Sequence, residues 1–140
     1  LSYPYACGIF GRKLETVMLR IGFTRPIQAV QYLSANPMSE QTRGGLEEFK
    51  RNLGAYISPR DITQLFTRAV EAPNIENEYG VPFVVAYGCS DNTRRFWSLE
   101  TARKYLDYQP EDDTEVIYSH DIAQLITGEG TNVRGGKLGI

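Results

Sequence analysis

Two short apolar runs, each closed by a glycine, constrain the fold of this 140-residue chain more than any other feature. Residues 15–22 read ETVMLRIG, and residues 81–87 read VPFVVAY before Gly88. Their length and β-branched content predict two buried strands. A helix lies between them in the sequence, and a strand–helix–strand crossover joins parallel strands. The sequence therefore predicts an α/β fold.

The connecting helix carries a clear start signal at Ser58-Pro59-Arg60-Asp61. Serine caps helices, proline is favoured at the first helical position, and an acid in the first turn complements the helix dipole. Apolar residues follow at helical spacing, and polar ones fall between them. The predicted sheet-facing set is Ile62, Leu65, Phe66, Ala69 and Val70, and the predicted solvent-facing set is Arg60, Gln64 and Arg68.

Weaker patterns predict the remaining elements. Short helices are expected at 28–33 and 46–53, another from Ser98 to Leu106, and a last one at 117–126. The residues from Thr127 onward contain five glycines and are expected to form a mobile tail.

A pair of parallel strands buries little surface and normally belongs to a larger sheet. We therefore expect residues 1–140 to form a single domain that corresponds to the later strands of a Rossmann-like, doubly wound sheet. No glycine-rich turn of the GxGxxG type follows a strand. The chain also starts at Leu1 rather than methionine, which favours a fragment. An unfinished sheet predicts self-association through its exposed edge.

Charge and composition limit the classes of molecule that this chain is expected to bind. Fifteen Lys and Arg against 17 Asp and Glu give a formal charge of −2, which does not favour nucleic acid or an anionic membrane. No apolar run approaches the roughly 20 residues that span a bilayer, so a cytoplasmic location is expected. Cys7 and Cys89 are isolated thiols, and the adjacent acids at 111–113 do not converge as metal ligands would. No metal site is expected.

Four motifs occur in an order that carries a resemblance: LRIG at 19–22, RNLGAYISPRD at 51–61, YGCSDN at 87–92 with Trp97, and LDYQPED at 106–112. Together they resemble the C-terminal half of NAD-dependent epimerase/dehydratases, in the extended short-chain dehydrogenase/reductase family. The uronate dehydrogenase-like branch is the most similar. The resemblance implies a role in hydride transfer between a sugar and NAD.

Carried over by position, the resemblance places Tyr5 at the catalytic tyrosine. It also places Tyr5, Ile21 and Gly22 beside the cofactor. The family's lysine, four residues after the tyrosine, is replaced by Ile9, which cannot lower the pKa of a phenol. Lys13 is the only nearby substitute. The helix between this motif and the first strand is shorter than the family's, so Tyr5 is either a relic or a weak participant.

The resemblance also implies three substrate-binding residues. Arg51 falls at the arginine that clamps the sugar carboxylate, a task that suits a guanidinium; the alternative is a solvated helix arginine. Phe23 replaces a small hydroxyl residue of the branch. Asn92 follows the second strand and either contacts the substrate or hydrogen-bonds backbone in a turn.

Two functions follow from these observations. The first is the substrate-binding part of an NAD-dependent sugar epimerase, dehydratase or dehydrogenase, inactive as an isolated chain because the glycine-rich motif and the lysine are missing. The second is a non-catalytic pseudoenzyme remnant that binds a sugar or another protein. The sequence leaves open the identity of the sugar and the choice between NAD and NADP.

Overall fold

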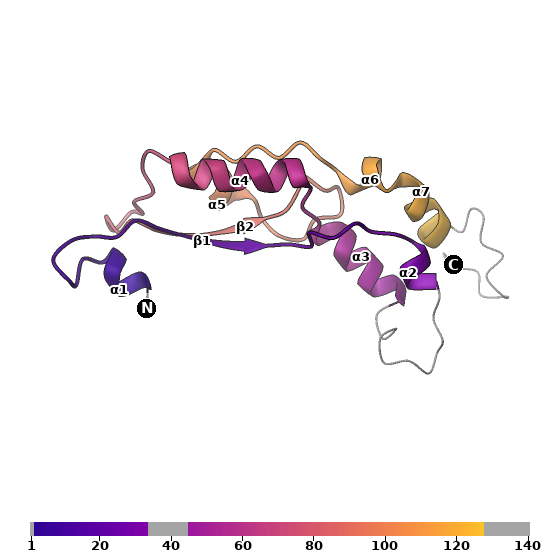
Figure 1. The fold of residues 1–140 in the computed structure, drawn as a ribbon, viewed down its shortest axis with the longest axis horizontal. Helices are drawn as coiled ribbons and strands as arrows, with labels where there is room; N and C mark the ends of the chain where they lie inside the picture. The colour runs from indigo at the N-terminus through magenta and orange to yellow at the C-terminus, as the bar shows by residue number, and fades with distance from the viewer. Residues whose placement is uncertain (1, 34–44, 128–140) are drawn as a thin grey trace.

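A two-stranded parallel sheet lies at the centre of the protein (Figure 1). The computed structural model describes residues 2–33 and 45–127. Strand β1 (Thr16–Ile21) pairs with β2 (Phe83–Gly88), in a register that runs from Thr16 opposite Phe83 to Ile21 opposite Gly88. The predicted α/β fold with parallel strands is confirmed.

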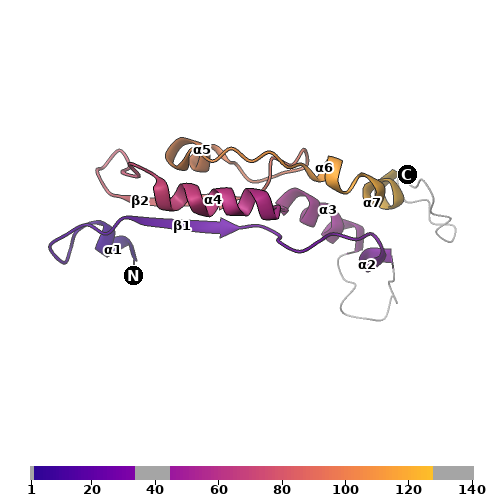
Figure 2. The same cartoon turned by 45° about the horizontal axis from the view of Figure 1, so that its top comes forward.

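The described helices cover only one face of this sheet. Helices α4 (Pro59–Glu71) and α5 (Glu100–Leu106) lie on that face, where Val84 and Ala86 are buried. On the opposite face, the short α1 (Ser2–Ala6) lies near the start of the strands, and Met18 and Val85 stay exposed (Figure 2). The prediction of two buried strands was therefore wrong for one face, because α1 is too short to cover it.

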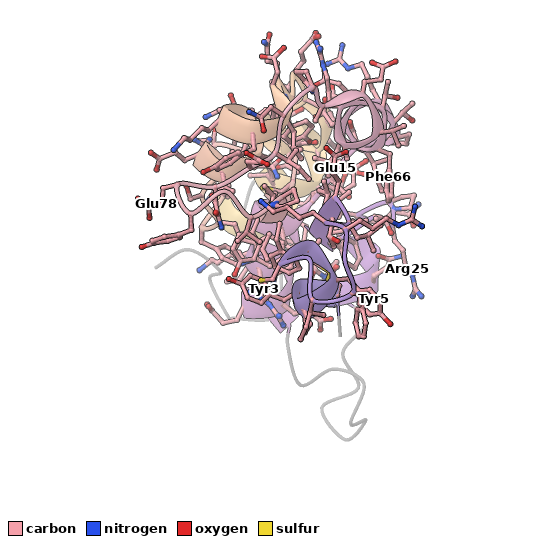
Figure 3. All side chains as sticks on the ribbon, turned by 90° about the vertical axis from the view of Figure 1, so that its left-hand side faces the viewer. Tyr3, Tyr5, Glu15, Arg25, Phe66 and Glu78 are labelled. Atoms are coloured by element: carbon pink, nitrogen blue, oxygen red, sulfur yellow. The ribbon has the colours of Figure 1, made fainter. Side chains whose placement is uncertain are left out.

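The start of α4 matches its predicted cap. Ser58 has an extended backbone and accepts a hydrogen bond from the amide of Asp61, and Pro59 opens the helix. The predicted apolar side is only partly buried. Leu65 is buried against the sheet, but Phe66 and Val70 are 48% and 85% exposed. Figure 3 shows Phe66 at the side of the molecule, and Val70 follows one helical turn later on the same face of α4.

The predicted solvent-facing side of α4 instead contacts the segment at 107–112. The side chain of Gln64 exchanges two hydrogen bonds with the backbone of Gln109, at 2.9 and 2.7 Å. Ion pairs flank this contact at both ends of the helix: Arg68 with Asp107 at 3.4 Å, and Arg60 with Glu111 and Asp112 at 3.1 and 2.7 Å. The predicted solvent-facing side is therefore exposed only in part, because this polar segment packs along it.

Asp61 also holds the segment at 107–112 against α4. Its carboxylate is fully buried and accepts hydrogen bonds from the amides of Glu111 and Asp112, at 3.0 and 3.1 Å. Sequence reasoning gave Asp61 only a dipole role. In the structure it satisfies two backbone donors of a segment 50 residues away, which a buried carboxylate does well.

A second apolar cluster lies beyond the carboxyl ends of the strands. Helix α3 (Gly45–Ala55) supplies Phe49 and Leu53, and α2 (Val30–Leu33) follows the buried residues Ile27 and Ala29. The predicted helices at 28–33 and 46–53 are thus present with shifted ends. The single helix predicted at 117–126 is divided into α6 (Thr114–Ile117), α7 (Ser119–Ile122) and the π-helix η2 (Ala123–Thr127). The predicted tail lies outside the described residues after Thr127.

None of the described helices has the length and apolarity to cross a membrane.

We predict that Asp61→Ala destabilises the protein by about 1–3 kcal/mol, because two partly buried backbone amides lose their buried acceptor. Urea unfolding monitored by circular dichroism measures this change. Glu71→Ala, at an exposed position of the same helix, is the control and should cost less than about 0.5 kcal/mol. Equal losses for the two variants would show that the Asp61 contacts carry no net stability.

We predict that the chain self-associates through the flank formed by β1, Phe66 and Val70. Light scattering at increasing concentration should show a rising mean mass, and Val70→Glu should lower it. Val116→Glu is a matched control because Val116 is 77% exposed on α6, away from the sheet. A monomer at every concentration would contradict the prediction.

Candidate functional site at the carboxyl edge of the sheet

The carboxyl ends of β1 and β2 meet at Gly22 and Gly88. The amide of Gly22 donates a hydrogen bond to the carbonyl of Gly88 at 2.9 Å. Ligands of open α/β sheets bind at this edge. Gly22 is required here for a steric reason, since a Cβ atom on it would lie 1.8 Å from the carbonyl oxygen of Ala55. The end of α3 therefore occupies the space beside Gly22.

Beyond β1, Phe23 pairs with Tyr56 in an isolated parallel β-bridge. Its amide donates to the carbonyl of Ala55 at 2.8 Å, and its carbonyl accepts from the amide of Ile57 at 2.9 Å. The phenyl ring is half-buried against the second apolar cluster. The backbone around Phe23 is thus fixed on both sides.

A pocket of about 270 Å³ opens beside Phe23, between the loop after β1 and helices α2 and α3. Polar side chains make up much of its lining, together with the rings of Phe23 and Tyr32, which suits a hydroxyl-rich ligand better than an apolar one. Its lining includes Phe23, Arg25, Gln31, Tyr32, Glu48 and Asn52. Its volume fits a ligand of monosaccharide size better than a dinucleotide.

The inner wall of the pocket is held in place by its own contacts. The amide nitrogen of Asn52 donates to the hydroxyl of Tyr32 at 2.8 Å. The ring of Tyr32 packs edge-on against the buried ring of Phe49, with centroids 5.2 Å apart. These side chains need little rearrangement to present their polar atoms to a ligand.

The pocket is lined by Arg25 rather than by Arg51. Arg51 is exposed on α3, beside the pocket residue Asn52 but outside the lining. Its role as a carboxylate clamp stays a prediction. Sequence reasoning missed Arg25, although its place three residues after Gly22 puts it near the carboxyl edge of β1 and was an available signal.

Asn92 serves the backbone. It is fully buried; its amide nitrogen donates to the carbonyls of Gly54 and Tyr56 at 3.3 and 2.8 Å, and its carbonyl oxygen accepts from the amide of Thr114 at 3.2 Å. Its side-chain hydrogen bonds are therefore used within the fold. The alternative in which Asn92 serves the backbone of its own turn differs from the structure, because all three side-chain partners are remote in sequence. Contact of Asn92 with substrate stays a prediction.

Tyr56, beside Phe23, is not an acid–base group at neutral pH. Burial, aided by a hydrogen bond with Tyr118, raises the pKa of the Tyr56 hydroxyl far above its usual value. The two rings meet edge to face, with centroids 5.2 Å apart. Tyr56 therefore packs the site rather than exchanging protons in it.

Tyr5 lies at the opposite end of the sheet. Its carbonyl accepts from the amide of Leu14, just before β1, and its neighbour Tyr3 packs edge-on against Phe83 at the start of β2, with centroids 5.1 Å apart. Figure 3 shows Tyr5 on α1 and Phe66 on α4 along one side of the molecule. A six-residue strand spans about 20 Å, so the structure does not bring Tyr5 to the pocket.

Lys13 does not replace the missing lysine in this arrangement. Its ammonium group donates to the carbonyl of Gly80 and lies 3.9 Å from a carboxylate oxygen of Glu76. Tyr5 packs its ring against Phe10 instead, with centroids 4.6 Å apart. Arg12 and Lys13 line a pocket together with Tyr5. The catalytic role of Tyr5 stays a prediction.

Trp97 and Tyr87 stack at the uncovered face near the same carboxyl edge. Their ring centroids lie 5.0 Å apart, and the guanidinium of Arg20 donates to the Tyr87 hydroxyl at 3.0 Å while lying over its ring. Trp97 also lies close to Gly22. Trp97 thus packs against the sheet through Tyr87 and lies beside Gly22.

Solved structures with the same fold are uronate dehydrogenases. A mutant of uronate dehydrogenase from Agrobacterium tumefaciens, complexed with NAD, is 21% identical and has a TM-score of 0.51; the alignment covers 84% of this chain and 34% of that one. Glucuronic acid dehydrogenase from Chromohalobacter salexigens is 22% identical with a TM-score of 0.52, over 86% of this chain and 35% of that one. These likenesses establish the Rossmann-like fold.

A curated relative adds a likeness in sequence. An NAD-dependent glucose-6-phosphate dehydrogenase from Haloferax volcanii is 34% identical over 68 residues, which is 49% of this chain and 23% of the relative. No protein-family model matches the chain. The chain thus spans about a quarter of the curated relative and about a third of the solved structures, and its resemblance to part of an NAD-dependent sugar dehydrogenase is confirmed.

We predict that Cys89, which follows β2 at this edge, resists thiol reagents in the folded protein. It is buried, and this burial raises its pKa to about 11, so at pH 8 only about one thiol in a thousand is ionised. Cys7 is exposed. Ellman's reagent should titrate one fast thiol in buffer and two in urea; two fast thiols in buffer would contradict the burial of this edge.

Proposed function

We propose that this chain provides the sugar-binding side of an NAD-dependent dehydrogenase that transfers hydride between an acidic sugar and NAD. The observation that carries the proposal is the monosaccharide-sized pocket at the carboxyl edge of a sheet whose fold is that of uronate dehydrogenases. The sequence likeness to an NAD-dependent dehydrogenase supports the same reaction class.

The substrates in the names of the similar proteins share one chemical feature. A uronate carries a carboxylate at carbon 6, and glucose 6-phosphate carries a phosphate at the same carbon. We therefore propose a hexose with an anionic group at carbon 6 as the substrate class. A guanidinium matches the oxygens of either anion with parallel donors.

NAD would accept or return the hydride, but the described residues do not fit its diphosphate. No glycine-rich turn opens a helix after either strand. The first turn of α4 is already engaged, since its Asp61 amide bonds Ser58 and its Asp61 carboxylate holds the segment at 111–112. We therefore assign to this chain the binding and orientation of the sugar, with Ile21 and Gly22 as its proposed cofactor contacts.

We predict that glucuronate binds the 140-residue chain and that NAD does not bind it with micromolar affinity. Amide shifts in a ¹⁵N correlation spectrum should move at Phe23 and around α3 on adding glucuronate. Calorimetry with NAD should give no measurable heat of binding. Absence of any shift with glucuronate, glucose 6-phosphate or glucose would refute a sugar-binding role, and micromolar NAD affinity would refute the assignment of the cofactor site.

A further inference from the structure

Among the residues that the structure describes, Arg25 is the one cation that lines the pocket, and the backbone on both sides of it is anchored. Arg25 sits between two anchors: Phe23 on one side is bridged to Tyr56, and Ile27 on the other is buried in the second apolar cluster. Pro26 restricts Arg25 further, because the residue before a proline is confined to extended conformations. A short loop held at both ends therefore presents the Arg25 side chain to the pocket.

The charge of Arg25 is available within the described part of the chain. No ion pair there involves it, whereas Arg60, Arg68, Arg94, Arg95 and Arg103 are all paired with carboxylates. Arg25 lines the pocket while being exposed, so it can reach an incoming anion without a costly desolvation.

Glu48 gives the pocket a second charge of opposite sign. It lies in the wall formed by α3, whereas Arg25 lies in the wall formed by the loop after β1. A carboxylate accepts hydrogen bonds from hydroxyls and repels an anion. The two walls therefore favour one orientation of an acidic sugar, with its anion toward Arg25 and its hydroxyls toward Glu48 and Asn52.

We propose that Arg25 is a specificity-determining residue that selects a hexose with an anionic group over its neutral counterpart. This inference rests on the proposed function, because it assumes that the pocket holds the sugar. It differs from the family-based assignment of Arg51, which lies outside the pocket lining. The shared ligand chemistry is an anion on a hexose, either a carboxylate or a phosphate.

The test compares three variants that each remove one positive charge. Arg25→Gln should weaken binding of glucuronate or of glucose 6-phosphate by about tenfold or more, since a charge-assisted, bidentate contact is lost. Arg12→Gln is the matched control, because Arg12 is exposed at the opposite end of the sheet, and it should change affinity less than about twofold. Arg51→Gln tests the alternative clamp, and glucose measures the affinity without an anion.

Each outcome is decisive. Selective loss of anionic-sugar binding in Arg25→Gln, with glucose unaffected, supports the inference, and the sugar that loses more identifies the anion as carboxylate or phosphate. Equal behaviour of Arg25→Gln and Arg12→Gln overturns the inference but leaves the proposed function standing. No binding of any sugar to the unmodified chain overturns both. Arg25→Lys serves as the second variant. It keeps the charge but loses the planar guanidinium, so its affinity for the acidic sugar should fall between that of the unmodified chain and that of Arg25→Gln.

Discussion

The close passage of Gly22 along the end of α3 is the constraint on which the rest of the structure depends. A side chain at this position would collide with the carbonyl of Ala55, so only glycine lets the backbone of Phe23 bond to residues 55–57. That bridge directs the chain out of the sheet and into the second apolar cluster. It also fixes the loop that carries Arg25, and therefore one wall of the pocket.

The two ends of the sheet have different chemistry. The carboxyl edge gathers a pocket with paired polar side chains, supported by Tyr32, Phe49 and the buried Asn92. The opposite edge holds Tyr5 against Phe10, with Lys13 turned toward Gly80. The residues placed together by family position are thus separated by the length of a strand. The proposed sugar pocket lies wholly at the carboxyl edge, and Tyr5 takes no part in it.

The sequence was sufficient for features that depend on local physics. Two apolar runs closed by glycine located β1 and β2, and the Ser58-Pro59 signal located the start of α4. Contacts between remote segments were not predictable in this way. The burial of Asp61 depends on amides 50 residues later, and the exposure of Phe66 depends on what lies beyond β1. The pocket was missed for the same reason, since Arg25, Tyr32 and Asn52 come from three separate segments.

Helix α3 contacts both the pocket and the loop that follows β2. Asn52 lines the pocket. Two residues later, the carbonyl of Gly54 accepts a hydrogen bond from the side-chain amide of Asn92, which lies in the loop after β2. Occupancy of the pocket and opening of the sheet are therefore coupled equilibria. Any molecule that binds only the folded α3 shifts the whole chain toward its native state in proportion to the logarithm of its concentration. A substrate at this edge would thus act as a stabiliser of the strands that it never touches.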